Sequence, residues 1–194
     1  MKCRESGMPD ENDWDSFFDA ECVVETMLGA DGCTGNLVEF GCGYGTFTLP
    51  AARRTAGAVL ALDIEAELIA QLQRLTRQRG VHNVRAELRD FLADGSGAGA
   101  KSQSHAMIYN LLHLEEPVTL LKEAYRVLLP GGKLSVIHWR TDIATPRGPS
   151  LDIRPTPNQC REWMEQAGFS EVVDVDLSVC CEFHFGLMGS RPLA

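Results

Sequence analysis

The sequence predicts an α/β fold, a doubly wound and mostly parallel sheet of seven strands with helices on both faces. Two observations lead to this prediction. Short apolar runs alternate with longer amphipathic segments along the 194 residues, which is the pattern of repeated β–α units. A glycine-rich turn joins the first apolar run to the helix that follows it, and an acidic residue ends the second run.

The expected elements form one domain that covers all 194 residues. Strands are expected at 37–40, 58–63, 84–88, 106–111, 134–139, 171–177 and 180–187, and helices at 13–30, from 46 onward, and at 65–79, 115–129 and 158–167. Residues 1–12 are expected to be disordered, with Asp13 as the N-cap of the first helix. The Gly/Ser-rich stretch 93–104 is expected to be a flexible loop, and Pro130–Gly132 to turn the chain back into the fifth strand.

The segment Asn36–Pro50, NLVEFGCGYGTFTLP, has the order of a buried strand, a glycine turn and a helix start. Gly41, Gly43 and Gly45 let the backbone turn sharply and approach a ligand where a Cβ would collide. The free N–H groups and the dipole of the new helix face the same crevice. A dinucleotide fingerprint, G-x-G-x-x-G/A, would need a glycine where this chain has Thr46.

An acid followed by three alternating glycines, from Glu39 to Gly45, instead resembles motif I of class I S-adenosylmethionine (SAM)-dependent methyltransferases, E/D-x-G-x-G-x-G. The stretch Arg126–Leu134, RVLLPGGKL, resembles a second hallmark of that family. The resemblance spans about Leu37–Trp139 and is closest to the small-molecule enzymes of the methyltransferase-domain 11 and 25 type. It implies the strand order 3-2-1-4-5-7-6, with strand 7 antiparallel.

The resemblance implies SAM as the cofactor and S-adenosylhomocysteine as the product. Asp63 ends the second strand, where a carboxylate can accept hydrogen bonds from both ribose hydroxyls, and capping the next helix is compatible with that role. Asp90 would contact the adenine amino group, with a simple loop cap as the alternative. Ile64 and Phe91 would pack against the adenine, and Asn110 would line the methionine end. The cofactor-binding candidates are Glu39, Gly41, Cys42, Gly43, Gly45, Asp63, Ile64, Asp90, Phe91 and Asn110.

His113 and His138 are the candidate catalytic residues. Both lie at the carboxyl ends of expected strands, where this architecture binds ligands, and an ordinary histidine pKa of about 6.5 suits a base. An ordinary loop histidine is an equally open interpretation of His113. Together with His184 these histidines could assemble a metal site, but their spacing does not require one, and no metal is expected.

The expected methyl acceptor is a small polar or anionic molecule. Methyl transfer needs mainly the alignment of two reactants and the exclusion of water, so a strong base is not required. The loop 141–157 contains four prolines and is long for a strand-to-helix connection, which favours a functional loop. The substrate-binding candidates are Arg140, Arg147, Arg154 and His184, with simple solvation of the two loop arginines as the alternative.

Composition limits the partners. The net charge of −9, from 18 basic and 27 acidic residues, argues against a nucleic-acid partner. No apolar stretch approaches the roughly 20 residues of a membrane span and the N-terminus lacks a signal-peptide core, so a cytoplasmic protein without a membrane partner is expected, as a monomer or homodimer. The seven cysteines contain no C-x-x-C pair, which indicates free thiols in a reducing compartment. Cys180 and Cys181 are expected to be small strand residues rather than metal ligands.

Two other classes of function stay open. An NAD-dependent oxidoreductase would share the fold and Asp63, but it needs the glycine that Thr46 replaces. A non-catalytic SAM-binding module would keep the glycine motif and lack an enclosed acceptor pocket. The expected helix 13–30 could lie over the mouth of the cofactor site or simply cover the sheet edge.

Overall fold

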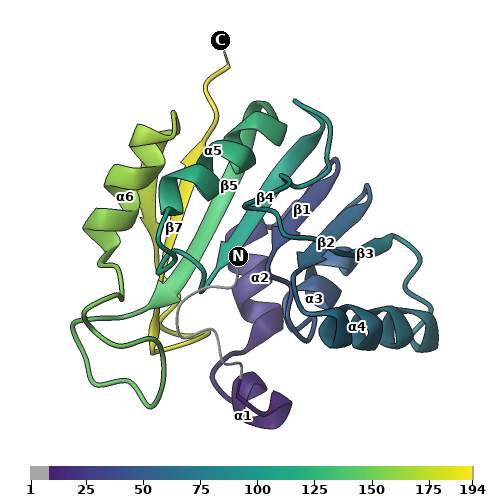
Figure 1. Cartoon of the computed structure of the whole chain (residues 1–194), viewed down its shortest axis with the longest axis horizontal. Coiled ribbons are helices and arrows are strands. Elements are labelled where there is room, and N and C mark those ends of the chain that lie inside the picture. The colour runs from purple at the N-terminus through teal and green to yellow at the C-terminus, as the bar shows by residue number, and fades with distance from the viewer. Residues whose placement is uncertain (1–8, 194) are drawn as a thin grey trace.

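The computed structural model describes residues 9–193, in which helices cover both faces of a seven-stranded sheet (Figure 1). The strands are β1 (Leu37–Phe40), β2 (Val59–Asp63), β3 (Val84–Leu88), β4 (Gln103–Tyr109), β5 (Leu128–Trp139), β6 (Ser170–Val175) and β7 (His184–Ser190). Their order is β3-β2-β1-β4-β5-β7-β6, and β7 runs antiparallel to β5 and β6. The predicted fold class, strand order and antiparallel last strand are confirmed.

Residues that alternate along the strands pack against helices on opposite faces of the sheet. The helices are α1 (Glu11–Asp15), α2 (Ala20–Leu28), α3 (Thr48–Arg53), α4 (Ala66–Gln78), α5 (Pro117–Val127) and α6 (Pro157–Gln166). Val38 and Phe40 of β1 belong to the core beneath α5 and α6, whereas Leu37 belongs to the core beneath α2 and α3. The short α1 lies at the edge where the parallel strands end (Figure 1).

The N-terminal region forms two helices rather than the single helix expected at 13–30. Asp19 interrupts it because its carboxylate caps α2, accepting a hydrogen bond from the Cys22 N–H at 3.0 Å. The N-cap of α1 is Asp10 and not Asp13. Disorder was expected at 1–12. Residues 1–8 lie outside the described residues, and the expectation is wrong for 9–12, because Asp10 caps α1 and residues 11–12 form its first positions.

The Pro-Gly-Gly segment after α5 forms a bulge inside a strand, where a turn was expected. The strand β5 begins at Leu128, directly after the helix, and pairs there with Gln103. The next paired residues are His105 and Lys133, so the intervening residues of β5 bulge out of register. Gly131 has a φ of 77°, which a glycine adopts without strain.

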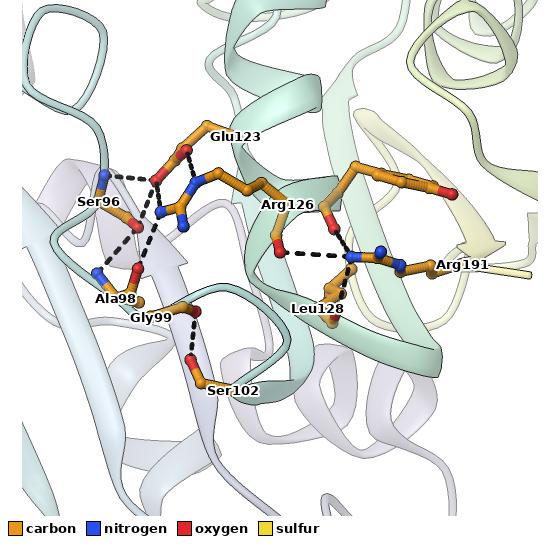
Figure 2. A network of polar contacts seen from close by, with 9 residues as sticks. Ser96, Ala98, Gly99, Ser102, Glu123, Arg126, Leu128 and Arg191 are labelled. Atoms are coloured by element: carbon orange, nitrogen blue, oxygen red, sulfur yellow. Dashed lines mark hydrogen bonds and ion pairs between the residues drawn. The ribbon is translucent and has the colours of Figure 1, made fainter. Parts of the chain in front are cut away.

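The Gly/Ser-rich loop before β4 is held against α5, although the sequence predicts a flexible loop. Figure 2 shows the Glu123 carboxylate accepting hydrogen bonds from Ser96, at 2.7 Å from its N–H and 2.6 Å from its hydroxyl. Arg126 pairs with the same carboxylate at 2.7 Å and donates to the Ala98 carbonyl at 2.8 Å. Two charged side chains of one helix therefore fix the loop.

The end of the chain is anchored to the same helix. The Arg191 Nη1 atom donates to the carbonyls of Tyr125 at 2.6 Å and Leu128 at 2.9 Å (Figure 2). These contacts satisfy carbonyls that the helix end leaves without an internal partner. The guanidinium also lies over the Tyr125 ring, 4.4 Å from its centre.

Candidate active site

A cavity of about 400 Å³ lies at the carboxyl ends of the parallel strands. Its wall has two parts, each with a different chemistry. The glycine-loop side follows β1, β2 and β3 and contains Gly41, Cys42, Gly43, Asp63, Ile64, Asp90 and Phe91. The aromatic side follows β4 and β5 and also includes the N-terminal segment and Phe47 at the start of α3; its residues are Trp14, Phe47, Tyr109, His113, Trp139, Arg147, Gly148 and Pro149. Asn110 lies at the end of β4, between β1 and β5 in the sheet.

On the glycine-loop side, Asp63 ties together the turns that follow β1 and β2. Its Oδ2 atom accepts a hydrogen bond from the Gly43 N–H at 2.8 Å, and its Oδ1 atom accepts one from the Glu65 N–H at 2.9 Å. Gly41 and Gly43 have φ angles of 76° and 52°, in the left-handed region that other residues rarely adopt. The carboxylate and the bare backbone therefore face the cavity together.

Glu39 and Gly45 lie behind this wall rather than on it. The Glu39 carboxyl is buried and accepts a hydrogen bond from the Thr48 hydroxyl at 2.5 Å, at the start of α3. Burial raises the pKa of Glu39 to about 8, opposed by the Thr48 hydrogen bond and assisted by the negative charge of Asp63. A Cβ on Gly45 would lie 2.5 Å from Leu72 Cδ1, so this glycine allows α4 to pack closely.

The residues expected at the adenine end come together on the wall. Asp90 Oδ1 accepts hydrogen bonds from the N–H groups of Leu92 at 3.3 Å and Ala93 at 3.1 Å, which gives it the loop-cap role considered as the alternative. The same side chain lines the cavity, so the two roles are compatible. Phe91 packs edge-on against Phe40, with ring centres 5.4 Å apart.

Asn110 has an unsatisfied side chain in the cavity wall. Its backbone has a φ of 57°, an uncommon conformation that asparagine tolerates better than most residues. Within residues 9–193, neither Oδ1 nor Nδ2 has a hydrogen-bond partner, although both atoms are buried. Buried polar groups are almost always paired in proteins, so this amide points to a ligand that completes its hydrogen bonds.

The two candidate catalytic histidines form a pair beneath the aromatic side. His113 lines the cavity, and its Nδ1 atom lies 3.2 Å from Nε2 of His138. His138 is completely buried behind it, and burial, together with the His113 ring, holds the pKa of His138 well below its usual range. His138 is therefore neutral at physiological pH and reaches the cavity only through His113.

His184 is buried between the rings of Phe18 and Trp139, whose centres lie 4.4 Å and 4.1 Å from its own. Burial, and secondarily the positive charge of Arg154, lowers the pKa of His184 to about 3. Its side chain supports Trp139 and does not reach the cavity wall.

The three candidate arginines separate. Arg147 lines the cavity. Arg140 forms a two-pronged ion pair with Asp142, at 2.9 Å and 2.6 Å, away from the wall. Arg154 directs its donors to the backbone of its own loop and also lies off the wall.

On the aromatic side, sequence reasoning named His113 and Arg147 and left open whether the N-terminal helix lies over the mouth of the site. Trp14 reaches the cavity because three side-chain contacts hold the N-terminal segment in place. The Tyr44 hydroxyl donates to the Pro9 carbonyl at 2.9 Å, Thr46 donates to Asp15 at 2.8 Å, and Gln71 donates to Glu11 at 2.7 Å. Tyr109 and Trp139 end parallel strands, and that position is the signal that could have identified them. The other residues overlooked on the wall are Pro9, Thr46, Phe47, Glu65, Leu68, Arg89, Leu92, Leu111, Leu114, Gly148 and Pro149.

The cysteines depart from the prediction of free thiols. Cys22 and Cys180 form a disulfide that joins α2 to the turn before β7. The two residues become neighbours because the Asp19 N–H also donates to the Cys180 carbonyl, at 2.8 Å. Cys180 and Cys181 lie in that turn and not in a strand. Cys33, Cys42, Cys160 and Cys181 are free and buried.

Within the described residues, no cluster of three histidine, cysteine or acidic side chains could hold a metal ion. No helix in the same part of the chain is long and apolar enough to cross a membrane.

Comparisons with known proteins agree with this geometry. The sequence profile of a family described as "Methyltransferase domain" matches residues 37–132. A 37.1 kDa protein in transposon TN4556 of Streptomyces fradiae, itself uncharacterized, is 33% identical over 164 residues, which cover 77% of this chain and 45% of that protein. The chain thus spans less than half the length of that relative.

Solved structures show the same fold. A SAM-dependent methyltransferase from Aquifex aeolicus matches with a TM-score of 0.77 and 20% identity over 94% of both chains. The [4+2]-cyclase SpnF matches with a TM-score of 0.71 and 18% identity, over 90% of this chain and 81% of its own. The oxidoreductase alternative finds no support in these matches. The family profile, the sheet order and the glycine loop with its acid agree: the chain contains a methyltransferase domain and has the fold of the class I SAM-dependent methyltransferases.

Proposed function

We propose that this protein transfers the methyl group of SAM to a small acceptor that carries a polar or anionic group. The unpaired Asn110 amide is the observation on which the proposal depends most. It lies on the wall beside the end of β1 on one side and the end of β5 on the other. A group bound there would be held between the glycine loop and His113.

The glycine-loop side fits the cofactor. Asp63 presents its carboxylate, Gly41 and Gly43 present bare backbone, and Ile64 and Phe91 present apolar surface. SAM supplies a sulfonium-bound methyl group that a nucleophile can displace. The chain itself contributes alignment and the exclusion of water, which the N-terminal segment assists through Trp14 on the wall.

The aromatic side fits the acceptor. The cavity is near the lower end of the usual size for ligand sites, about 300–1,000 Å³, and the cofactor takes a share of it, which favours a small acceptor. Trp14, Tyr109 and Trp139 would contact its apolar body, and Arg147 would bind its polar or anionic group. The acids of the cavity wall, Asp63, Glu65 and Asp90, all lie at or directly after the ends of β2 and β3.

His113 is the proposed base for acceptors that lose a proton, and His138 orients its ring through Nδ1. For acceptors that need no base, alignment and the exclusion of water by the cavity wall would suffice.

A thermal melt with S-adenosylhomocysteine, SAM and NAD in parallel tests the cofactor. At a ligand concentration about 100 times Kd, binding stabilises the protein by about 2.7 kcal/mol. For a chain of this length the expected rise in Tm is roughly 5–10 °C. No rise with S-adenosylhomocysteine or SAM contradicts the proposal, and a rise with NAD alone favours the oxidoreductase.

A transfer assay then separates an enzyme from a SAM-binding module. Release of S-adenosylhomocysteine is measured with a panel of small phenols, carboxylates and amines. His113→Ala is expected to reduce turnover about 100-fold or more for acceptors that lose a proton, with cofactor affinity unchanged. Unchanged turnover would remove His113 as the base.

A further inference from the structure

The acceptor wall is completed by a loop that has little regular structure of its own. Residues 140–156 connect β5 to α6, and Arg147, Gly148 and Pro149 from this loop line the cavity. A loop of this length needs specific contacts to hold one conformation, because ordering each backbone residue costs roughly 1–2 kcal/mol. The contacts of Arg154 supply them.

The guanidinium of Arg154 binds the loop at several points of its backbone. Nε and Nη2 donate to the Pro149 carbonyl at 3.0 Å and 2.7 Å, and Nη1 donates to the Arg140 carbonyl at 2.8 Å. Nη1 also donates to the Thr145 hydroxyl at 2.7 Å, which in turn donates to the Arg147 carbonyl at 2.8 Å. One side chain thus joins the end of β5 to the cavity-lining residues.

Gly148 is enclosed between this guanidinium and the end of β5. A Cβ built on Gly148 would lie 2.8 Å from Arg154 Nη2 and 2.9 Å from Trp139 Cγ. Its φ of 120° is also a conformation that other residues rarely adopt. The loop backbone is therefore packed directly between Arg154 and Trp139, and Trp139 itself lines the cavity.

The charge of Arg154 is used in an unusual way. Among residues 9–193 no carboxylate pairs with it, and its acceptors are carbonyl and hydroxyl oxygens. Burial lowers the pKa of Arg154, as expected for a cation with no anionic partner. A guanidinium has five donors in a rigid planar fork, which a lysine ammonium cannot reproduce.

We infer that Arg154 is a positioning residue that fixes Arg147, Gly148 and Pro149 as the acceptor wall, and so determines which acceptors fit. The inference rests on the proposed function and deepens it. The sequence predicts that Arg154 binds the substrate directly, whereas in this inference Arg154 affects the substrate only by positioning the loop. Arg154 does not touch the glycine-loop side, so cofactor binding should not depend on it.

Hydrogen exchange of the loop amides tests the inference, with wild type, Arg154→Ala and Arg154→Lys compared in the presence of S-adenosylhomocysteine. Arg154→Ala is expected to speed exchange in residues 145–153 and to leave the sheet unchanged. In Arg154→Lys the exchange rate of these amides is expected to lie between those of wild type and Arg154→Ala, because lysine keeps the charge and lacks the planar fork of donors. Ethylguanidinium, at concentrations too low to denature the protein, is expected to slow exchange in Arg154→Ala again. Arg161→Ala is the control, because Arg161 pairs with Asp174, away from the cavity.

The functional readouts separate this inference from the proposed function. In Arg154→Ala the affinity for S-adenosylhomocysteine should stay within about twofold, while kcat/KM for the acceptor found in the panel falls about 10- to 100-fold. The inference would be overturned if Arg154→Ala left hydrogen exchange of the loop amides unchanged, or if its affinity for S-adenosylhomocysteine fell as much as its kcat/KM. Failure of the wild-type protein to bind S-adenosylhomocysteine would instead overturn the proposed function.

Discussion

The two sides of the cavity are built in different ways. The glycine-loop side is built from short segments that follow β1, β2 and β3, and the Asp63 side chain connects two of those turns. The aromatic side is assembled from segments far apart in the sequence: Trp14 near the start, Tyr109 and Trp139 at strand ends, and the loop that Arg154 holds. In the proposed function the first side binds the cofactor and the second binds the acceptor.

Titration sharpens this comparison, because the two sides respond to pH in opposite directions. Behind the glycine-loop side, burial raises the pKa of Glu39 from the ordinary 4.5 to about 8. Behind the aromatic side, burial lowers the pKa of His184 from 6.5 to about 3. Between pH 4.5 and about 8, folding therefore takes up a proton at Glu39. Between about pH 3 and 6.5, folding releases a proton at His184.

The largest expected effect is that of Glu39→Gln on the pH dependence of stability. The stability that the protonated Glu39 contributes is complete below pH 4.5 and is lost as the pH rises through about 8. At about 1.4 kcal/mol per pH unit, the loss is on the order of 5 kcal/mol. Measured by urea denaturation, the free energy of unfolding of wild type should fall from pH 4 to pH 9 relative to that of Glu39→Gln. Glu67→Gln, at an exposed position of α4, is the control; a parallel response of Glu39→Gln and wild type would contradict the prediction.

The next largest effect is expected from Asp63→Ala on cofactor affinity. The two charge-assisted hydrogen bonds that Asp63 is proposed to accept from the ribose would be worth about 4 kcal/mol together, so Kd for S-adenosylhomocysteine should rise about a thousandfold. Isothermal titration calorimetry measures it, with Asp94→Ala as the control at an exposed position outside the cavity. The Kd of Asp63→Asn, which keeps one acceptor oxygen, should lie between those of wild type and Asp63→Ala. A Kd within threefold of wild type would remove Asp63 from the cofactor site.

The sequence was sufficient for the fold and for most of the glycine-loop side because both depend on local patterns. A buried run, alternating glycines and a strand-end acid determine where Gly43 and Asp63 must lie. Glu39 illustrates the limit of such reasoning: the motif identifies the residue, but only the packed structure shows its carboxyl bound to Thr48 behind the wall.

The aromatic side could not be predicted in the same way because tertiary contacts decide it. Arg154 and Arg147 occupy similar positions in one loop, and nothing in the sequence indicates that one binds the backbone while the other faces the cavity. Trp14 reaches the wall only because the chain breaks at Asp19 and the preceding segment binds Tyr44 and Thr46. Similarly, Cys22 and Cys180 are 158 residues apart, and no spacing rule would pair them.

The smallest of the three effects is expected from that disulfide, and it should act on the aromatic side alone. The bond joins α2 to the turn before β7, next to Phe18 and His184, whose rings pack together. A disulfide typically stabilises a protein by about 2–4 kcal/mol, so reduction should lower Tm by on the order of 10 °C.

Differential scanning calorimetry with and without dithiothreitol measures this shift, and the Cys22→Ser/Cys180→Ser protein is the control that should not respond to the reductant. The affinity of the reduced protein for S-adenosylhomocysteine should stay unchanged, because the disulfide contacts none of the glycine-loop side. A loss of affinity for S-adenosylhomocysteine on reduction would show that the two sides of the cavity are coupled. Equal Tm values for the oxidised and reduced protein would show that α2 is held by its apolar contacts with α3 and β1, without help from the covalent bond.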